Sequence, residues 1–109
     1  MEIKEDILIM NYTYNWTQNE YMENTEVYER YINWVSGEFD LYQKQESKAL
    51  KVYFPNGWFV IRRLNKSNEG FVMEIKVEGK SKLACEQVKL RLKSIYDHVK
   101  YFQNLKNNI

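Results

Sequence analysis

Residues 50–64, with the sequence LKVYFPNGWFVIRRL, decide the fold of this chain. The first part of the stretch alternates apolar and polar side chains, which is the pattern of a strand with one buried face. Pro55, Asn56 and Gly57 then give a strong turn signal, because proline presets one backbone dihedral and Asn-Gly tolerates positive φ. Apolar residues resume at Trp58, so the stretch predicts a β-hairpin.

The hairpin belongs to a longer run of predicted strands. Residues 58–64 and 71–77 are predicted to form the next two strands, joined by a polar loop. Upstream, Phe39 and Leu41 alternate with polar residues and predict one more short strand, which a polar turn at residues 43–47 follows. Four antiparallel strands in a meander are the result.

One strand and one helix are predicted before the meander. From Leu8 to Trp16 apolar residues alternate with polar ones, which predicts a strand with one buried face. Thr17 followed by Glu20 matches a capping box, in which the two side chains satisfy the first free backbone amides of a helix. The helix is therefore predicted to begin at Thr17 and to end at Gly37.

A long second helix is predicted after the meander. Ser81 is placed to cap it, and no glycine or proline interrupts it before the Asn-rich C-terminus. Its apolar residues recur at the helical spacings of three and four, at Cys85, Val88, Leu92, Ile95, Val99 and Phe102. At roughly 25 residues this helix would be about 37 Å long, enough to cross a small sheet.

The predicted architecture is a single α+β domain over residues 1–109, with the order strand, helix, four-stranded antiparallel meander, long C-terminal helix. This order resembles the TATA-binding-protein-like or helix-grip arrangement, in which a curved antiparallel sheet wraps a long C-terminal helix. The composition, 44% hydrophobic and 28% charged, is that of a globular protein.

A family resemblance leads to the same fold. Residues 51–62 (KVYFPNGWFVIR), with residues 77–81 (VEGKS) and the helix after them, resemble the C-terminal domain of the phosphohexomutases, such as phosphomannomutase, over residues 48–100. In that family an arginine, matched by Arg62, precedes a Pro-Ser-Gly-Thr-Glu-Pro loop that grips the sugar phosphate. Residues 63–68 do not match this loop, and the family's catalytic serine and metal-binding domain have no counterpart. The resemblance implies the fold, and we expect no mutase activity.

Composition and charge narrow the class of protein. Cys85 is the single cysteine, so we expect a reducing, cytoplasmic location without disulfides. The acidic N-terminus does not resemble a signal peptide, and no stretch approaches the roughly 20 apolar residues of a membrane span. Abundant Asn, Lys, Tyr and Ile are typical of a low-GC bacterium or its phages.

The net charge of +1 conceals a split along the chain. Residues 1–47 hold ten acids and three bases, whereas residues 48–109 hold thirteen bases and five acids. Such asymmetry either brings the two halves together in the fold or marks opposite faces for different partners. We favour the first interpretation.

Known catalytic and cofactor-binding motifs, including the Walker loop, the dinucleotide glycine pattern, HExxH and GxSxG, do not occur in the sequence. His98 has no second histidine or cysteine at metal-ligand spacing and is expected at the surface. Cys85 begins the apolar stripe and is expected to be a buried structural thiol. We therefore expect no enzyme activity, no metal and no cofactor.

Two regions combine bases with other recognition groups. The segment 62–68 gathers Arg62, Arg63 and Lys66 among small polar side chains, which could bind phosphate or carboxylate unless the segment is an ordinary solvated turn. One predicted sheet face mixes bases with aromatic residues, at Lys51, Tyr53, Trp58, Arg62 and Lys76, diluted by Glu74 and Glu78. The pI of 7.8 favours a protein interface over nucleic acid for this face.

The first half of the chain has more aromatic residues than one helical stripe can bury, namely Tyr21, Tyr28, Tyr31, Trp34 and Tyr42. Some of them must be exposed, and exposed Tyr and Trp beside acids fit a protein-binding surface or an acidic patch that imitates nucleic acid. The stripe of the second helix could also extend past the sheet as the seam of a homo-oligomer.

The leading hypothesis is a small non-enzymatic binding protein, an adaptor or inhibitor that acts through protein contacts. Two alternatives stay open: a small-ligand or phosphosugar binder, and a nucleic-acid binder that uses the basic C-terminal half. The predicted binding residues are Trp34, Tyr53, Trp58, Arg62, Arg63 and Lys66.

Overall fold

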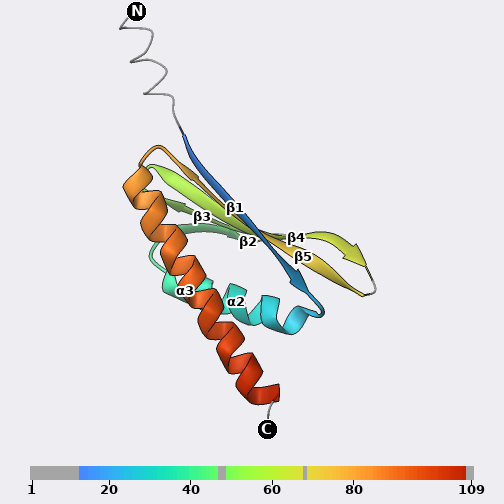
Figure 1. The fold of residues 1–109 in the computed structure, drawn as a ribbon. Helices are drawn as coiled ribbons and strands as arrows, with labels where there is room; N and C mark the ends of the chain where they lie inside the picture. The colour runs from blue at the N-terminus through green and yellow to red at the C-terminus, as the bar shows by residue number, and fades with distance from the viewer. Residues whose placement is uncertain (1–12, 47–48, 68, 108–109) are drawn as a thin grey trace, which may run out of the picture.

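The computed structural model of the chain describes residues 13–46, 49–67 and 69–107. Figure 1 shows its elements, which are β1 (Tyr14–Met22), α2 (Thr25–Glu38), β2 (Gln43–Glu46), β3 (Ala49–Phe54), β4 (Gly57–Ser67), β5 (Gly70–Gly79) and α3 (Lys82–Asn107). The predicted α+β class and the predicted order of elements are confirmed. The expected strand positions Leu8, Met10 and Tyr12 lie outside the described residues.

The five strands form one antiparallel sheet in the order β1-β5-β4-β3-β2. The strands from β2 to β5 form a meander as predicted, with β2 at other residues than the predicted strand. Strand β1 joins the meander by pairing with β5 along all nine of its residues. The predicted hairpin turn is confirmed, since Phe54 pairs with Gly57. Asn56 between them has φ 66, the left-handed conformation that asparagine tolerates.

Both helices pack on the same face of the sheet, and the core lies between them and the strands. Strand side chains alternate between the two faces, so every second residue of β3, β4 and β5 points toward the helices. The largest fully buried side chains come from strands, helices and the turn after α2, and they are Tyr31, Val35, Phe39, Val52, Phe59, Ile61, Met73, Ile75, Val77, Cys85, Leu92 and Val99.

The predicted stripe of α3 is buried at Cys85, Val88, Leu92 and Val99, Ile95 is partly buried, and the position of Phe102 is a correction. Phe102 is 46% exposed because the C-terminal part of α3 extends beyond the sheet and beyond α2, as Figure 1 shows. Tyr96, which the predicted stripe left out, is buried against Tyr31 in an edge-to-face contact with 5.3 Å between ring centroids.

The predicted capping box at Thr17 and Glu20 is wrong. Both residues belong to β1, because pairing with the whole length of β5 stabilises the extended chain more than an isolated first turn stabilises a helix. Asn24 is the observed cap, and its side chain accepts a 3.0 Å hydrogen bond from the Glu26 amide. The helix also continues through Gly37, and Phe39 forms its C-cap.

The predicted strand at Phe39 and Leu41 is also wrong. Phe39 is buried and its amide donates to the Val35 carbonyl at 3.0 Å, while Leu41 is 97% exposed in the following turn. The strand lies instead at Gln43–Glu46, where a turn was predicted. Within the described part of the chain this strand pairs with β3 alone, at the sheet edge, where backbone hydrogen bonds suffice without an apolar pattern.

Candidate functional site

The predicted binding residues fall on separate parts of the molecule. Trp34 lies on α2, whereas Tyr53 and Trp58 face each other across the β3–β4 hairpin. Arg62 and Arg63 are consecutive strand residues of β4 and therefore point to opposite faces of the sheet. Lys66 also belongs to β4, and its side chain is outside the described part of the chain.

The predicted anion-binding loop at residues 62–68 is therefore corrected to strand over residues 62–67. Arg62 forms a 2.6 Å ion pair with Glu74 on β5. Arg63 points toward the helices, where its guanidinium carbon lies 4.7 Å from the ring centre of Tyr28 and 5.0 Å from that of Phe71. The two arginines cannot grip one phosphate together, because the sheet separates them.

The outer face of the sheet, defined as the face turned away from α2 and α3, gathers the other predicted bases and aromatic residues. The strand register places them in rows that run across the sheet. One row is Tyr53, Trp58, Glu78 and Asn15, and the next is Lys51, Val60, Lys76 and Thr17. The sequence prediction that Lys51, Tyr53, Trp58, Arg62 and Lys76 share one face agrees with this register.

Lys51 links the aromatic pair of the outer face. Its Nζ lies 4.4 Å from the ring centre of Trp58 and 5.1 Å from that of Tyr53. Both distances are in the range of cation–π attraction, about 0.5 to 1 kcal/mol at an exposed site. The lysine and the two rings thus form one ordered cluster.

A second surface, called the seam surface here, lies where α2 and α3 meet and consists of Trp34, His98, Tyr101 and Phe102. The ring centres of Trp34 and His98 are 5.5 Å apart, and those of His98 and Phe102 are 4.8 Å apart, both nearly perpendicular. Trp34 is 49% exposed and Tyr101 is 61% exposed. Sequence reasoning singled out Trp34 but missed the ring contacts, because His98 is distant from Trp34 in the chain.

Next to Trp34 the surface is hollowed. A shallow hollow of about 320 Å³ is lined by Asn33, Trp34, Gly37 and Glu38. A Cβ atom added to Gly37 would meet nothing within 4 Å, so this side of α2 is open. The hollow beside the indole of Trp34 is therefore open to the surroundings of the molecule.

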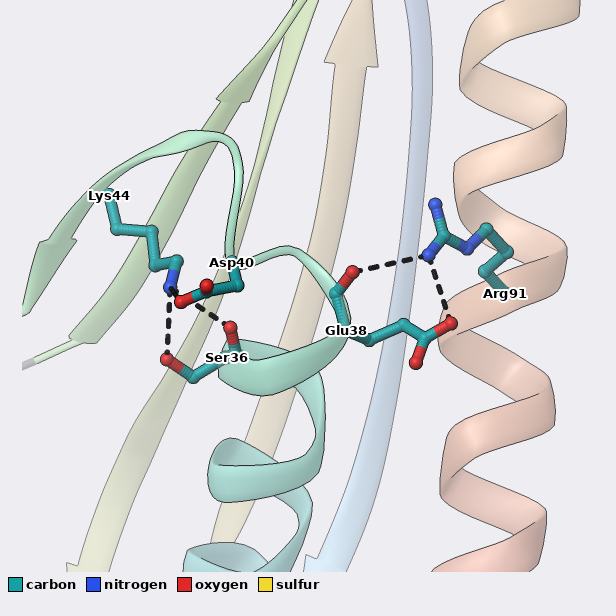
Figure 2. A network of polar contacts seen from close by, with 5 residues as sticks. All are labelled: Ser36, Glu38, Asp40, Lys44 and Arg91. Carbon is teal, nitrogen blue, oxygen red and sulfur yellow. Dashed lines mark hydrogen bonds and ion pairs between the residues drawn. The ribbon is translucent and has the colours of Figure 1, made fainter.

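Polar contacts fix the C-terminal end of α2 beside this hollow, as Figure 2 shows. Arg91 of α3 donates to the Glu38 carbonyl at 3.3 Å and to its Oε1 at 3.1 Å. On the other side, Lys44 of β2 donates to the Ser36 carbonyl at 2.9 Å and lies 3.5 Å from an oxygen of Asp40. Cations at a helix C-terminus also complement its dipole. These contacts hold α2, and with it Trp34, in place.

The pair Glu38–Arg91 joins the acidic and basic halves of the chain, as the favoured interpretation of the charge split expects. The other ion pairs of the described residues are local, within one half, and Arg30–Glu26 and Lys89–Glu86 lie within single helices. Most of the charge asymmetry is therefore left at the surface.

The two residues weighed for chemistry lie in different surroundings. Cys85 is buried as predicted, and burial, with Glu86 nearby, raises the pKa of its thiol. A raised pKa disfavours the thiolate that a nucleophile needs. His98 lies at the surface as predicted, edge-on to the rings of Trp34 and Phe102.

Metal-ligand clusters of three or more His, Cys, Asp or Glu side chains do not occur within residues 13–46, 49–67 and 69–107. In the same part of the chain no helix has the length and apolar character needed to cross a membrane.

Comparison with protein-family models and with curated proteins gives no match. The resemblance to the phosphohexomutase domain stays a prediction.

Proposed function

We propose that the protein is a non-enzymatic binding module that contacts another protein through the seam surface. The observation that carries the proposal is the exposed aromatic cluster at the α2–α3 junction. Trp34 and Phe102 remain about half exposed although the core of the domain is complete without them. Aromatic residues are enriched at protein interfaces, and Trp and Tyr are frequent among the residues that dominate binding energy.

The geometry of the cluster favours binding. Edge-to-face contacts with His98 restrain the rings of Trp34 and Phe102 before any partner arrives. Immobilising a freely rotating side chain on association costs about 0.5 to 1.5 kcal/mol. Side chains that are already restrained avoid part of this cost. The adjacent hollow offers space for one side chain of a partner.

A catalytic role is not part of the proposal, because Cys85 is buried with a raised pKa and His98 is held between two rings. A cytoplasmic location and an origin in a low-GC bacterium or phage belong to the same proposal and rest on the sequence.

Self-association through α3 is one form that the protein contact can take, because Tyr101, Phe102 and Leu105 are exposed at its free end.

Affinity capture with matched variants tests the proposal. The wild type, Trp34→Ala and the control Leu41→Ala would be immobilised and exposed to extract of the producing cells. Leu41 is the control because it is 97% exposed and lies outside the seam surface. Loss of a dominant interface residue weakens binding by at least about 2 kcal/mol, or roughly 30-fold. We expect a protein that the wild type and Leu41→Ala retain and Trp34→Ala loses; identical recovery by all three would refute the proposal.

A small-ligand function is the second candidate, and the hollow beside Trp34 is the observation that favours it. Its volume of about 320 Å³ is at the lower end of the range for ligand pockets. Thermal-shift measurements with indole separate the two functions, because a ligand at about 100 times its dissociation constant adds about 2.7 kcal/mol to stability. A shift that Trp34→Ala abolishes would favour the ligand.

A further inference from the structure

The outer face of the sheet differs chemically from the seam surface and is far from it in the fold, on the opposite side of the strands from both helices. We propose that the outer face binds single-stranded nucleic acid, with bases stacked on Tyr53 and Trp58 and phosphates held by Lys51 and Lys76. This binding would be additional to the protein contact proposed above, and it does not depend on it.

The stacking platform is the cross-strand pair Tyr53 and Trp58. The register places the two residues directly opposite each other, so their Cβ atoms are about 5 Å apart. Both side chains are half-buried, and both stand on strands whose inner residues are packed in the core. Aromatic rings on the open face of an antiparallel sheet with helices behind it are a recurrent means of stacking successive unpaired bases.

The charges of the face complement a phosphate backbone. Arg62 and Glu74 neutralise each other in a 2.6 Å ion pair. Lys51 and Lys76 form no ion pair with any carboxylate of the described residues, and Glu78 is the remaining acid in the two rows. Since β4 separates the two lysines, their backbones are about 10 Å apart, so they can contact different phosphates of one strand.

The overall pI favoured a protein interface for this face, but the residues that the strand register places at its centre disfavour one. Lys and Glu are depleted at the centre of protein interfaces, whereas here Lys51, Lys76 and Glu78 lie among the central positions. Beyond Lys76 the face continues onto β1 with Asn15 and Thr17, whose side chains are exposed. Amides and hydroxyls of this kind can hydrogen-bond the edges of splayed bases.

Fluorescence anisotropy with a labelled oligothymidylate of about eight nucleotides tests the proposal, because sites of this size suit one small domain. Each phosphate contact adds about −0.7 to the slope of the logarithm of the binding constant against the logarithm of the salt concentration. Two contacts therefore predict roughly sevenfold weaker binding at about 200 mM than at about 50 mM salt. Stacking of about 1 to 3 kcal/mol per base predicts roughly tenfold weaker binding for Trp58→Leu.

Matched variants separate this site from general charge. Lys51→Gln and Lys76→Gln should each weaken binding and make the salt slope shallower by about 0.7. Lys93→Gln removes the same charge from an exposed position on α3 and should leave binding unchanged, as should Trp34→Ala on the seam surface. No binding at the lower salt concentration, equal losses in Lys93→Gln, or equally good competition by polyglutamate would each overturn the proposal. None of these results would affect the seam surface.

Discussion

Replacing Tyr31 with phenylalanine removes one hydroxyl from the centre of the α2–α3 contact, and we expect its effect on stability to disappear at alkaline pH. The Tyr31 side chain is fully buried, and its hydroxyl donates a 2.9 Å hydrogen bond to the Leu92 carbonyl. The net contribution of one such bond is about 1 kcal/mol. At neutral pH, Tyr31→Phe should therefore lower the free energy of unfolding by about 1 kcal/mol.

Alkaline pH acts in the opposite direction on the wild type. Burial, followed by the proximity of Tyr96 and Asp97, raises the pKa of Tyr31 well above its usual value of 10.0. A raised native pKa gives stability that is complete below the unfolded pKa and is lost as pH rises above it, because only the unfolded chain releases the proton. From this group alone the loss is about 1.4 kcal/mol by about pH 11. Tyr31→Phe has no such loss, so the two proteins should be about equally stable near that pH.

Urea unfolding followed by far-UV circular dichroism, at pH 7 and at about pH 11, measures both effects in free energy. Tyr96, whose pKa burial raises to about 12, contributes to the alkaline loss in both proteins and cancels in the comparison. Tyr101→Phe is the control, since Tyr101 is 61% exposed, and should change nothing at either pH. The reasoning would be refuted if the difference between wild type and Tyr31→Phe were the same at both pH values.

Three further changes test the packing. Gly37→Ala should raise the free energy of unfolding by about 0.5 to 1 kcal/mol in thermal melts, because the glycine is inside α2 with open space beside it; a lower melting temperature would contradict this. Gly79→Ala should instead lower it by about 1 to 3 kcal/mol, because the new Cβ would lie 2.7 Å from the Cys85 Sγ. Lys44→Met should lower it by about 1 kcal/mol in urea titrations by removing the hydrogen bond to the last turn of α2, and an unchanged midpoint would exclude that role.

The features predicted correctly from sequence are those that local chemistry determines. Pro55, Asn56 and Gly57 specify a tight turn whatever surrounds them, and the turn is found with Asn56 at φ 66. The stripe from Cys85 to Val99 is long enough that no competing pattern fits it. Both signals lie within one continuous segment of the chain.

The errors arose where a local signal competed with tertiary pairing. Thr17 and Glu20 match a capping box, and the apolar alternation that begins before them is interrupted at Gln18 and Glu20. The strand continues to Met22 because β5 provides a partner for every residue of β1. The true cap, Asn24, stands two residues after the end of β1 and was available as a signal. At β2 the residues are all polar, so only the neighbouring strand β3, and no pattern in the sequence, determines the strand.

One candidate surface could likewise be predicted from sequence, and the other could not. Tyr53 and Trp58 were predicted to share a face because the period of two along a strand fixes which side chains point together. The seam surface could not be found from sequence, because Trp34 meets His98 and Phe102 only through the crossing of two helices. Arg62 and Arg63 are a different case, because they are neighbours in the sequence but lie on opposite faces of the sheet.

The alternation of the strands also makes binding and stability separable by mutation. Val52 and Phe54 point into the core, whereas Lys51 and Tyr53, one residue away, point outward. A substitution at Lys76 leaves every buried contact in place, so a surface change of this kind is expected to alter stability by no more than about 0.5 kcal/mol. A substitution at Lys51 also removes its cation–π contacts with Tyr53 and Trp58, which contribute about 0.5 to 1 kcal/mol. A variant of Lys76 that loses nucleic-acid binding while keeping its unfolding midpoint therefore reports on recognition alone. The same variant cannot disturb the seam surface, because the core lies between the sheet and the exposed surface of the two helices.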